Sequence, residues 1–255
     1  MIFDLAIFST YILLLFISVL GYGLIFNKYI NTHYLNSNKL NIGEIGFFAL
    51  LILIPISIIT NFFFKINYLF VSIIFIVGFI LFFWQIKFKK NFVKILFSIL
   101  FLFILMPYFY LSSHHDDFYY YHLPYLNILQ NLKIIFGLIN LNNVLAYPQN
   151  LWFNVFSLFR LPIIDFNGIQ ALNGIFTLFF IIFCYENFLN SKLFKIKIIN
   201  LTFLIFIFVL FSRLKDHGAE IIPQLLMLVC SYYIFELLFD ESINKNKYIT
   251  KIILI

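Results

Sequence analysis

Seven long apolar runs dominate the chain and limit what it can fold into. In chain order they are residues 5–26, 45–64, 67–86, 94–112, 168–189, 197–213 and 219–239. Each approaches the roughly 20 residues that an α-helix needs to cross a hydrocarbon core about 30 Å thick. The sequence therefore predicts an all-α fold, a polytopic bundle of transmembrane helices with about seven full spans and additional interfacial helices.

The composition excludes the soluble classes of protein. Of the 255 residues, 63% are hydrophobic and only 11% are charged, against roughly 45–50% and about 25% in soluble domains. A water-soluble domain needs a polar exterior that this chain cannot supply. The net charge of +6 lies mostly in short Lys clusters between apolar runs, a pattern typical of membrane orientation. We therefore expect the lipid bilayer as a partner, and no nucleic acid.

Lysines predict the orientation of the spans, because Lys and Arg gather on the cytoplasmic side. One cluster lies between the third and fourth runs, and another follows Glu186. Residues 113–148, the longest polar stretch, then lie on the outer face. Apolar residues recur there at about helical spacing, at Leu126, Leu129, Leu132 and Ile135. This spacing predicts an amphipathic helix on the membrane surface, with Gly137 as its C-cap.

One apolar run, residues 149–161, is too short to cross, since its 13 helical residues would reach only about 20 Å. We expect a short helix that lies in the interface or dips into it. If this run does cross, every later side assignment inverts. An eighth run begins near Tyr248 and ends with the chain. The expectation is thus a single transmembrane domain, residues 1–255, that is truncated within its eighth span.

Ionisable residues are scarce, and the first notable group follows the fourth apolar run. It consists of His114, His115, Asp116, Asp117 and His122. Adjacent carboxylates repel each other unless a cation, a metal or a hydrogen-bond donor compensates. The group therefore suits a general base or a ligand set for a divalent ion. The alternative is an ordinary solvated loop.

A second polar group joins the sixth and seventh runs and is expected on the same outer face. Arg213 and Lys215 are cations that can hold a phosphate, and Glu220 can hold a sugar hydroxyl or a metal. Glu220 also lies at a helix start, where the helix dipole favours an anion. The alternative is a set of snorkelling residues at a helix end.

The remaining ionisable residues have plainer interpretations. Glu186 and Glu236 lie near the predicted inner ends of spans, where interfacial residues need no function. Arg160 and Asp165 flank the short apolar run and are expected to pair.

Three segments together resemble the first outer loop of GT-C type membrane glycosyltransferases. They are Asp117-Phe-Tyr-Tyr-Tyr121-His122-Leu-Pro, Gly137-Leu-Ile-Asn-Leu141 and Asn150-Leu-Trp152. The likeness is to bacterial members with an Asp-x-x-x-Tyr-His pattern, which are related to dolichyl-phosphate-mannose protein mannosyltransferases and lipid A aminoarabinose transferases. It covers roughly residues 94–240. The segment His217-Gly-Ala-Glu220 resembles the family's second acidic loop, where Asp is more usual than Glu.

The resemblance implies an enzyme that takes a sugar from a polyprenyl-phosphate donor and transfers it to an acceptor glycan, lipid or protein. Direct in-line attack would invert the anomeric centre. Asp117 matches the family's catalytic base, and Asp116 is the adjacent alternative. The expected substrate-binding residues are His115, Tyr121, His122, Arg213, Lys215 and Glu220. A divalent cation, Mg²⁺ or Mn²⁺, stays open as a cofactor, and the expected place is the outer face of a bacterial inner membrane.

Two other classes of function remain open. A transporter or flippase for a lipid-linked or polar substrate would carry ionisable or helix-breaking residues near the middle of its spans. Here the mid-span positions are almost all apolar, with Pro55 as an exception. A non-catalytic membrane scaffold would tolerate the loss of Asp116 and Asp117.

Overall fold

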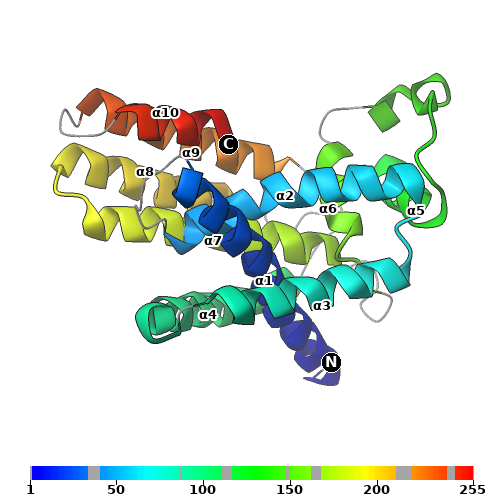
Figure 1. Ribbon diagram of the computed structural model, residues 1–255, viewed down its shortest axis with the longest axis horizontal. Coiled ribbons are helices and arrows are strands. Elements are labelled where there is room, and N and C mark those ends of the chain that lie inside the picture. Colours follow the sequence, from blue (N-terminus) through cyan, green and yellow to red (C-terminus); the bar gives the residue numbers. More distant parts are fainter. Residues whose placement is uncertain are drawn as a thin grey trace.

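The computed structural model describes most of the chain, and the described part is helical. It covers residues 2–33, 41–86, 88–110, 117–146, 150–161, 168–210, 220–239 and 245–254. Within these ranges there is no β-strand, and the helices form an elongated bundle (Figure 1). The prediction of an all-α fold is confirmed.

The elements follow one another in a simple order. They are α1 (Ile2–His33), α2 (Ile42–Phe63), α3 (Tyr68–Gln85), α4 (Phe88–Tyr110), the π-helical turn η1 (Phe118–His122), α5 (Leu123–Asn131), the 3₁₀ turns η2 (Leu138–Asn140) and η3 (Asn143–Ala146), α6 (Asn150–Ser157), α7 (Gly168–Asn190), α8 (Phe194–Leu210), α9 (Ile221–Phe239) and α10 (Lys245–Leu254).

Among the described residues, five helices are long and apolar enough to cross a membrane. Their crossing segments are Asp4–Ile30, Ile42–Phe63, Tyr68–Gln85, Ala171–Asn190 and Ile221–Phe239. The two other predicted spans are shorter as apolar helices. In α4 the apolar part is Ile95–Pro107, after a lysine-rich start, and α8 has 17 residues. The structure thus supports a multi-pass membrane protein, with five candidate spans where the sequence predicts seven.

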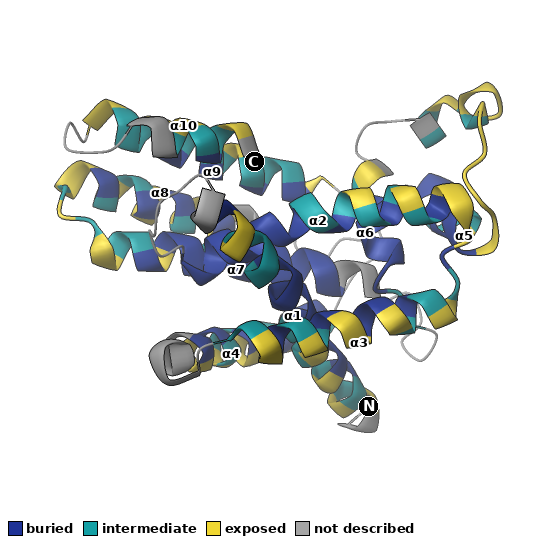
Figure 2. Cartoon of the chain, viewed as in Figure 1, coloured by how far each residue is buried: buried dark blue, intermediate teal, exposed yellow. Residues whose placement is uncertain are grey.

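The core lies around α7 and the crossing of α1 with α3. In its most apolar stretch, α7 is 72% buried, whereas α3 is 28% buried and presents most of its side chains outward. Figure 2 shows the buried residues concentrated along the middle of the bundle. A Cβ on Gly21 of α1 would overlap the carbonyl oxygen of Gly78 in α3. The two glycines therefore allow the backbones of α1 and α3 to approach closely, as small residues do between membrane helices.

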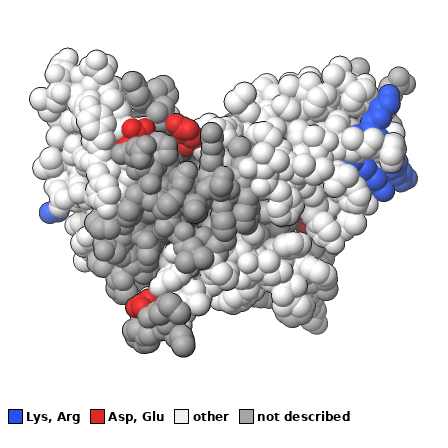
Figure 3. Space-filling model, turned by 180° about the vertical axis from the view of Figure 1, so that it is seen from behind, with Lys and Arg blue, Asp and Glu red and all other residues white. Residues whose placement is uncertain are grey.

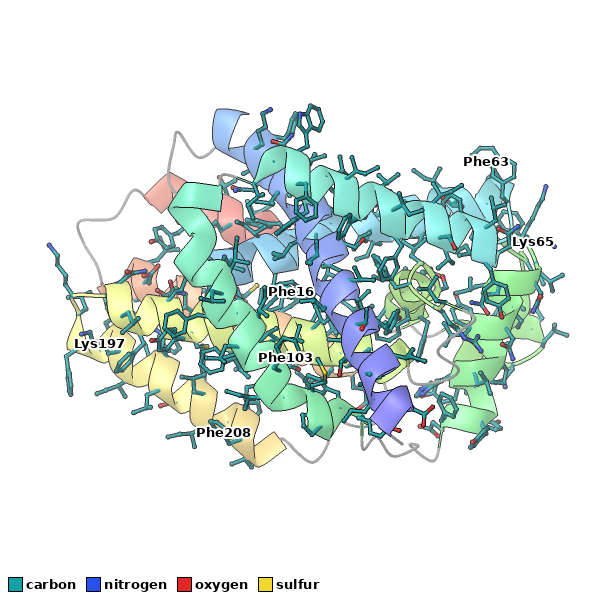
Figure 4. The ribbon with its side chains drawn as sticks, turned by 90° about the horizontal axis from the view of Figure 1, so that it is seen from below. Phe16, Phe63, Lys65, Phe103, Lys197 and Phe208 are labelled. Atoms are coloured by element: carbon teal, nitrogen blue, oxygen red, sulfur yellow. The ribbon has the colours of Figure 1, made fainter. Side chains whose placement is uncertain are left out.

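Polar contacts show that the start of α2 and the C-terminal part of α7 lie at the same end of the bundle. The side chain of Asn41, just before α2, donates to Asn187 Oδ1 near the end of α7 at 3.3 Å. Lys197 at the start of α8 lies over the Phe188 ring of the same region. In Figure 4, Lys197 marks this end and Lys65, which follows α2, lies at the opposite end. Helices α2 and α7 thus run in opposite directions, as the predicted alternation of spans requires.

The helix α6 is short, and it lies inside the protein. Its 8 residues extend only about 12 Å, so it does not cross a membrane. Phe153, Val155 and Phe156 are fully buried, and α6 packs mainly against α2 and α5. The predicted short helix is therefore present and packs against other helices, and its position in or below the membrane interface stays a prediction.

A helix occurs where the sequence predicts an amphipathic one, but it is shorter than predicted. In α5, Leu126 and Leu129 are buried against the bundle, and the helix ends at Asn131. The Asn61 side chain donates to the Leu129 and Leu132 carbonyl oxygens, at 3.1 Å each. These contacts take the acceptors that a further turn would need. Gly137 is therefore not the C-cap of this helix; it has a φ of 84° and precedes η2.

Candidate functional site

The Asp-x-x-x-Tyr-His motif folds as one local unit. The backbone N–H groups of Tyr120, Tyr121 and His122 point back to the Asp117 carbonyl oxygen at 3.1–3.5 Å. Asp117 thus begins the π-helical turn η1, which continues directly into α5. Such turns are rare and frequently occur at functional sites. The motif on which the family resemblance rests is therefore also the most unusual backbone segment described in this chain.

Three side chains of η1 are buried next to the half-buried carboxylate of Asp117, whereas Tyr119 and Tyr120 are exposed. Tyr121 and His122 are buried, whereas Asp117 is half-buried. The Tyr121 hydroxyl donates to Asp117 Oδ2 at the long distance of 3.4 Å. The His122 ring packs between Tyr121 and Phe153 of α6, with ring centroids 4.2 and 4.7 Å away. This packing holds η1 in place while the carboxylate stays accessible from outside.

Helices α5 and α6 extend the site with further polar groups. Tyr125 of α5 packs on Phe153 and has a hydrogen bond with the Asn154 side chain of α6. Burial raises the pKa of Tyr125 above its usual value, although the hydrogen bond with Asn154 opposes this shift. Tyr125 therefore stays protonated at neutral pH and keeps a hydroxyl donor in the site.

A cation, Arg160, lies beside α5. Arg160 Nη1 donates to Asn127 Oδ1 at 3.0 Å and to Gln130 Oε1 at 2.9 Å. Arg160 is one of only two arginines in the chain, and the sequence predicted for it only a pairing with Asp165. Its expected partner Asp165 lies outside the described residues. The observed partners hold the guanidinium beside α5.

Two buried polar atoms between α5 and α6 have unused hydrogen-bonding capacity. Within the described ranges, Gln130 Nε2 and Asn154 Oδ1 have no hydrogen-bond partner. Buried polar groups are nearly always satisfied by protein, water or a ligand. These two atoms can therefore form additional hydrogen bonds on the α5–α6 side of the site.

The structure brings together three of the predicted site residues, namely Asp117, Tyr121 and His122. Glu220 is exposed and directly precedes α9, where its carbonyl oxygen accepts from the Gln224 N–H at 3.5 Å. The other predicted site residues lie outside the described residues: His115, Asp116, Arg213 and Lys215. The shared site built from both polar groups therefore stays a prediction. On the face in Figure 3, most acidic atoms lie in the half away from the largest Lys and Arg cluster.

A metal site is not assembled by the described residues. No group of three or more His, Cys, Asp or Glu side chains that could hold a metal ion occurs in that part of the chain. The neighbours that would complete a set around Asp117, namely His114, His115 and Asp116, lie outside it. A divalent cation therefore also stays a prediction.

A second polar cluster, absent from the sequence predictions, lies at the opposite end of the bundle. Glu44, near the start of α2, accepts from the Tyr233 hydroxyl at 2.6 Å and forms a buried ion pair with Lys251 of α10. The Asn41 backbone N–H donates to the other carboxylate oxygen at 2.9 Å. The Lys251 ammonium also lies 4.9 Å from the centroid of the Tyr233 ring. This cluster joins α2, α9 and α10.

The two inner glutamates of the sequence interpretation have distinct surroundings. Glu236 accepts from the Tyr232 hydroxyl at 2.6 Å. Glu186 is buried and lines a cavity of about 220 Å³ between α4 and α7, together with Ser98, Phe101 and Tyr185. Glu186 is therefore largely covered by protein, and its expected place at the inner interface stays a prediction.

The comparisons with known proteins place the chain in a family without assigning an activity. No curated protein matches the chain, and no solved structure matches it. A model of a domain of unknown function, DUF8201, matches residues 5–255. Because this match covers almost the whole sequence, the chain belongs to the DUF8201 family.

Proposed function

We propose that this protein is an integral membrane glycosyltransferase that uses a polyprenyl-phosphate-linked sugar as donor. The observation that carries the proposal is the arrangement of η1. In this turn the half-buried carboxylate of Asp117 lies next to the buried Tyr121 and His122 rings. The turn follows α4, close to where membrane spans end. A polyprenyl tail stays in the bilayer, so the sugar phosphate that it carries lies at this same boundary.

In the proposed reaction, Asp117 acts as the general base, with Asp116 beside it. The acceptor hydroxyl gives its proton to the carboxylate while its oxygen attacks the anomeric carbon. The bond from that carbon to the phosphate oxygen breaks, and polyprenyl phosphate leaves with the electron pair. Attack from the side opposite the leaving group inverts the anomeric centre. A positioned base of this kind contributes about 10²–10⁴-fold to a rate.

The leaving phosphate needs cations, and the outer end of the bundle holds one. Arg160 is oriented by Asn127 and Gln130, and a guanidinium has five N–H donors in all. Arg213 and Lys215 are the further cations that the sequence predicts. Tyr121, His122 and Glu220 are proposed to contact the sugar or the acceptor, and Mg²⁺ or Mn²⁺ is proposed as an optional ion at the acidic residues. The proposed location is the outer face of a bacterial inner membrane.

The test is sugar transfer in proteoliposomes that contain the purified chain. Undecaprenyl-phosphate donors that carry different radiolabelled sugars are screened, and release of polyprenyl phosphate is measured. We expect Asp117→Asn to lower the turnover by at least about 10²-fold while membrane insertion is unchanged. Asp4→Asn, a carboxylate change at an exposed position of α1 outside the motif, is the matched control. Wild-type turnover in Asp117→Asn would overturn the assignment of the base.

One observation favours a second candidate, a transporter or flippase. Glu44 and Lys251 are buried ionisable residues within the helical bundle, and such residues often mark substrate or ion pathways. If the protein is a transporter, Glu44→Gln abolishes lipid-linked sugar translocation between leaflets, and Asp117→Asn leaves it unchanged. The opposite pattern, with loss of transfer in Asp117→Asn alone, supports the glycosyltransferase.

A further inference from the structure

We propose that residues 132–141, here named the outer finger, insert into the outer leaflet of the bilayer beside α2 and α3. The partner surface is the lipid itself, with acyl chains around the apolar side chains and phosphates around the neighbouring lysines. The proposal rests on α2 and α3 crossing the membrane and does not depend on the proposed sugar transfer.

The outer finger is apolar and exposed along most of its length. Its exposed apolar side chains are Leu132, Ile134, Ile135, Phe136, Ile139 and Leu141. Phe136 and Leu141 are each 81% exposed, and Figure 2 shows this loop as a continuous exposed strip beyond α5. Single exposed apolar residues are ordinary, but a contiguous group marks an interaction surface.

The outer finger is attached firmly to the tip of α2. The Ile134 N–H donates to the Asn61 carbonyl oxygen at 2.9 Å, and the Asn61 side chain donates to the Leu132 carbonyl oxygen. The rings of Phe62 and Phe136 meet edge to face, with centroids 6.1 Å apart. Asn61 itself is buried. The outer finger therefore has a defined position at the end of a membrane span.

The surface around this attachment is the lipid-facing surface of the spans. Ile59 and Phe63 on α2, and Leu69 on α3, are all more than half exposed, although both helices are candidate spans. In a membrane these side chains contact acyl chains. Because Phe62 touches Phe136, the apolar surface of the finger continues that of the spans. This continuity identifies lipid, rather than a separate protein, as its partner.

Two lysines lie where the lipid phosphates would be. Lys65 directly follows the exposed aromatic end of α2 and lies at the outer tip of the bundle (Figure 4). Lys133 lies within the outer finger and is also exposed. Lysines at the ends of membrane segments extend toward the headgroups while their stems contact apolar surface. The finger thus carries both components of an interfacial anchor, apolar side chains and cations.

The test is fluorescence quenching on the full chain in vesicles of phosphatidylglycerol and phosphatidylethanolamine. Cys184 and Cys230 are replaced by Ala, and single cysteines at Phe136, at Ile76 and at Asn127 are labelled with bimane. Ile76 lies on the exposed face of α3 within a span, and Asn127 is exposed on α5. Acyl-brominated lipids quench probes in the leaflet, and iodide quenches probes in water.

We expect the probe at position 136 to behave like that at position 76, with at least twofold stronger quenching by brominated lipid than at position 127. Strong iodide quenching at position 136, equal to that at position 127, would show a finger in water and overturn the proposal. Protection from both quenchers would show coverage by protein, such as a second copy, and would also overturn it. The double variant Phe136→Asp, Leu141→Asp should lower the quenching of a probe at Ile135 by brominated lipid.

Discussion

At the residue scale, the Asp117 site and the Glu44 cluster differ in how much one charged side chain needs another to be stable. The Asp117 carboxylate is half-buried, and its hydrogen bond from the Tyr121 hydroxyl is long, at 3.4 Å. Glu44 and Lys251 are both buried and directly paired. A buried charge without its partner is costly, because neither water nor another ion replaces the lost interaction. The inner pair is therefore sensitive to single substitutions.

We expect Glu44→Gln or Lys251→Met to destabilise the protein by about 3–5 kcal/mol, the usual cost of removing one partner of a buried ion pair. The double variant should lose less than the sum of the two, since it leaves no unpaired charge. Thermal unfolding in detergent micelles measures both. Glu220→Gln and Lys133→Met, at exposed positions, are the matched controls and should shift the melting temperature little. Additive losses in the double variant would contradict the pairing.

At the element scale, the sequence predicts helices well and their surroundings poorly. Long apolar runs predict α1, α2, α3, α7 and α9, because length alone identifies a span. The packing of α6 against α2 and α5 was not predictable, since a short apolar run has the same pattern whether it contacts lipid or other helices. The π-helical turn has no sequence signature either. The early end of α5 depends on Asn61, a residue about 70 positions earlier, in a contact that no local pattern contains.

The close crossing of α1 and α3 leads to a prediction about glycine. We expect Gly21→Ala to destabilise the protein by about 1–3 kcal/mol, because the new Cβ would overlap the Gly78 carbonyl oxygen and push the helices apart. Gly137→Asn is the control, since Asn tolerates the left-handed conformation that Gly137 adopts. Unfolding in detergent micelles compares the two variants. Equal stability of Gly21→Ala and the wild type would show that α1 and α3 do not cross this closely.

At the scale of the whole molecule, the opposite directions of α2 and α7 define two ends with different chemistry. One end carries η1, α5 and Arg160, and the other carries the Glu44 cluster and the lysines around the start of α8. The sequence predicts this division through its lysine clusters, because charge decides orientation. It does not predict the Glu44–Lys251 pair, whose partners are 207 positions apart. Whether the Arg213–Glu220 segment joins the Asp117 site is likewise decided by tertiary packing.

The division into two ends predicts the result of cysteine labelling. In a background without Cys184 and Cys230, we expect Lys65→Cys and Tyr119→Cys to react with a membrane-impermeant maleimide added outside intact cells. Lys197→Cys should react only after the cells are permeabilised. Positions 65 and 119 are exposed and position 197 is half-buried in the structure, so none of the three thiols is hidden in the core. Reaction of positions 65 and 197 from the same side would contradict the arrangement of α2 and α7.

The ion pair between α2 and α10 also has a consequence for synthesis in the cell. The ribosome makes Glu44 207 residues before Lys251, an interval on the order of 10–40 s at about 5–20 residues per second. Throughout that interval α2 enters the bilayer while Glu44 has no Lys251 to pair with. Release of α2 from the insertion machinery is therefore expected to await the arrival of α10.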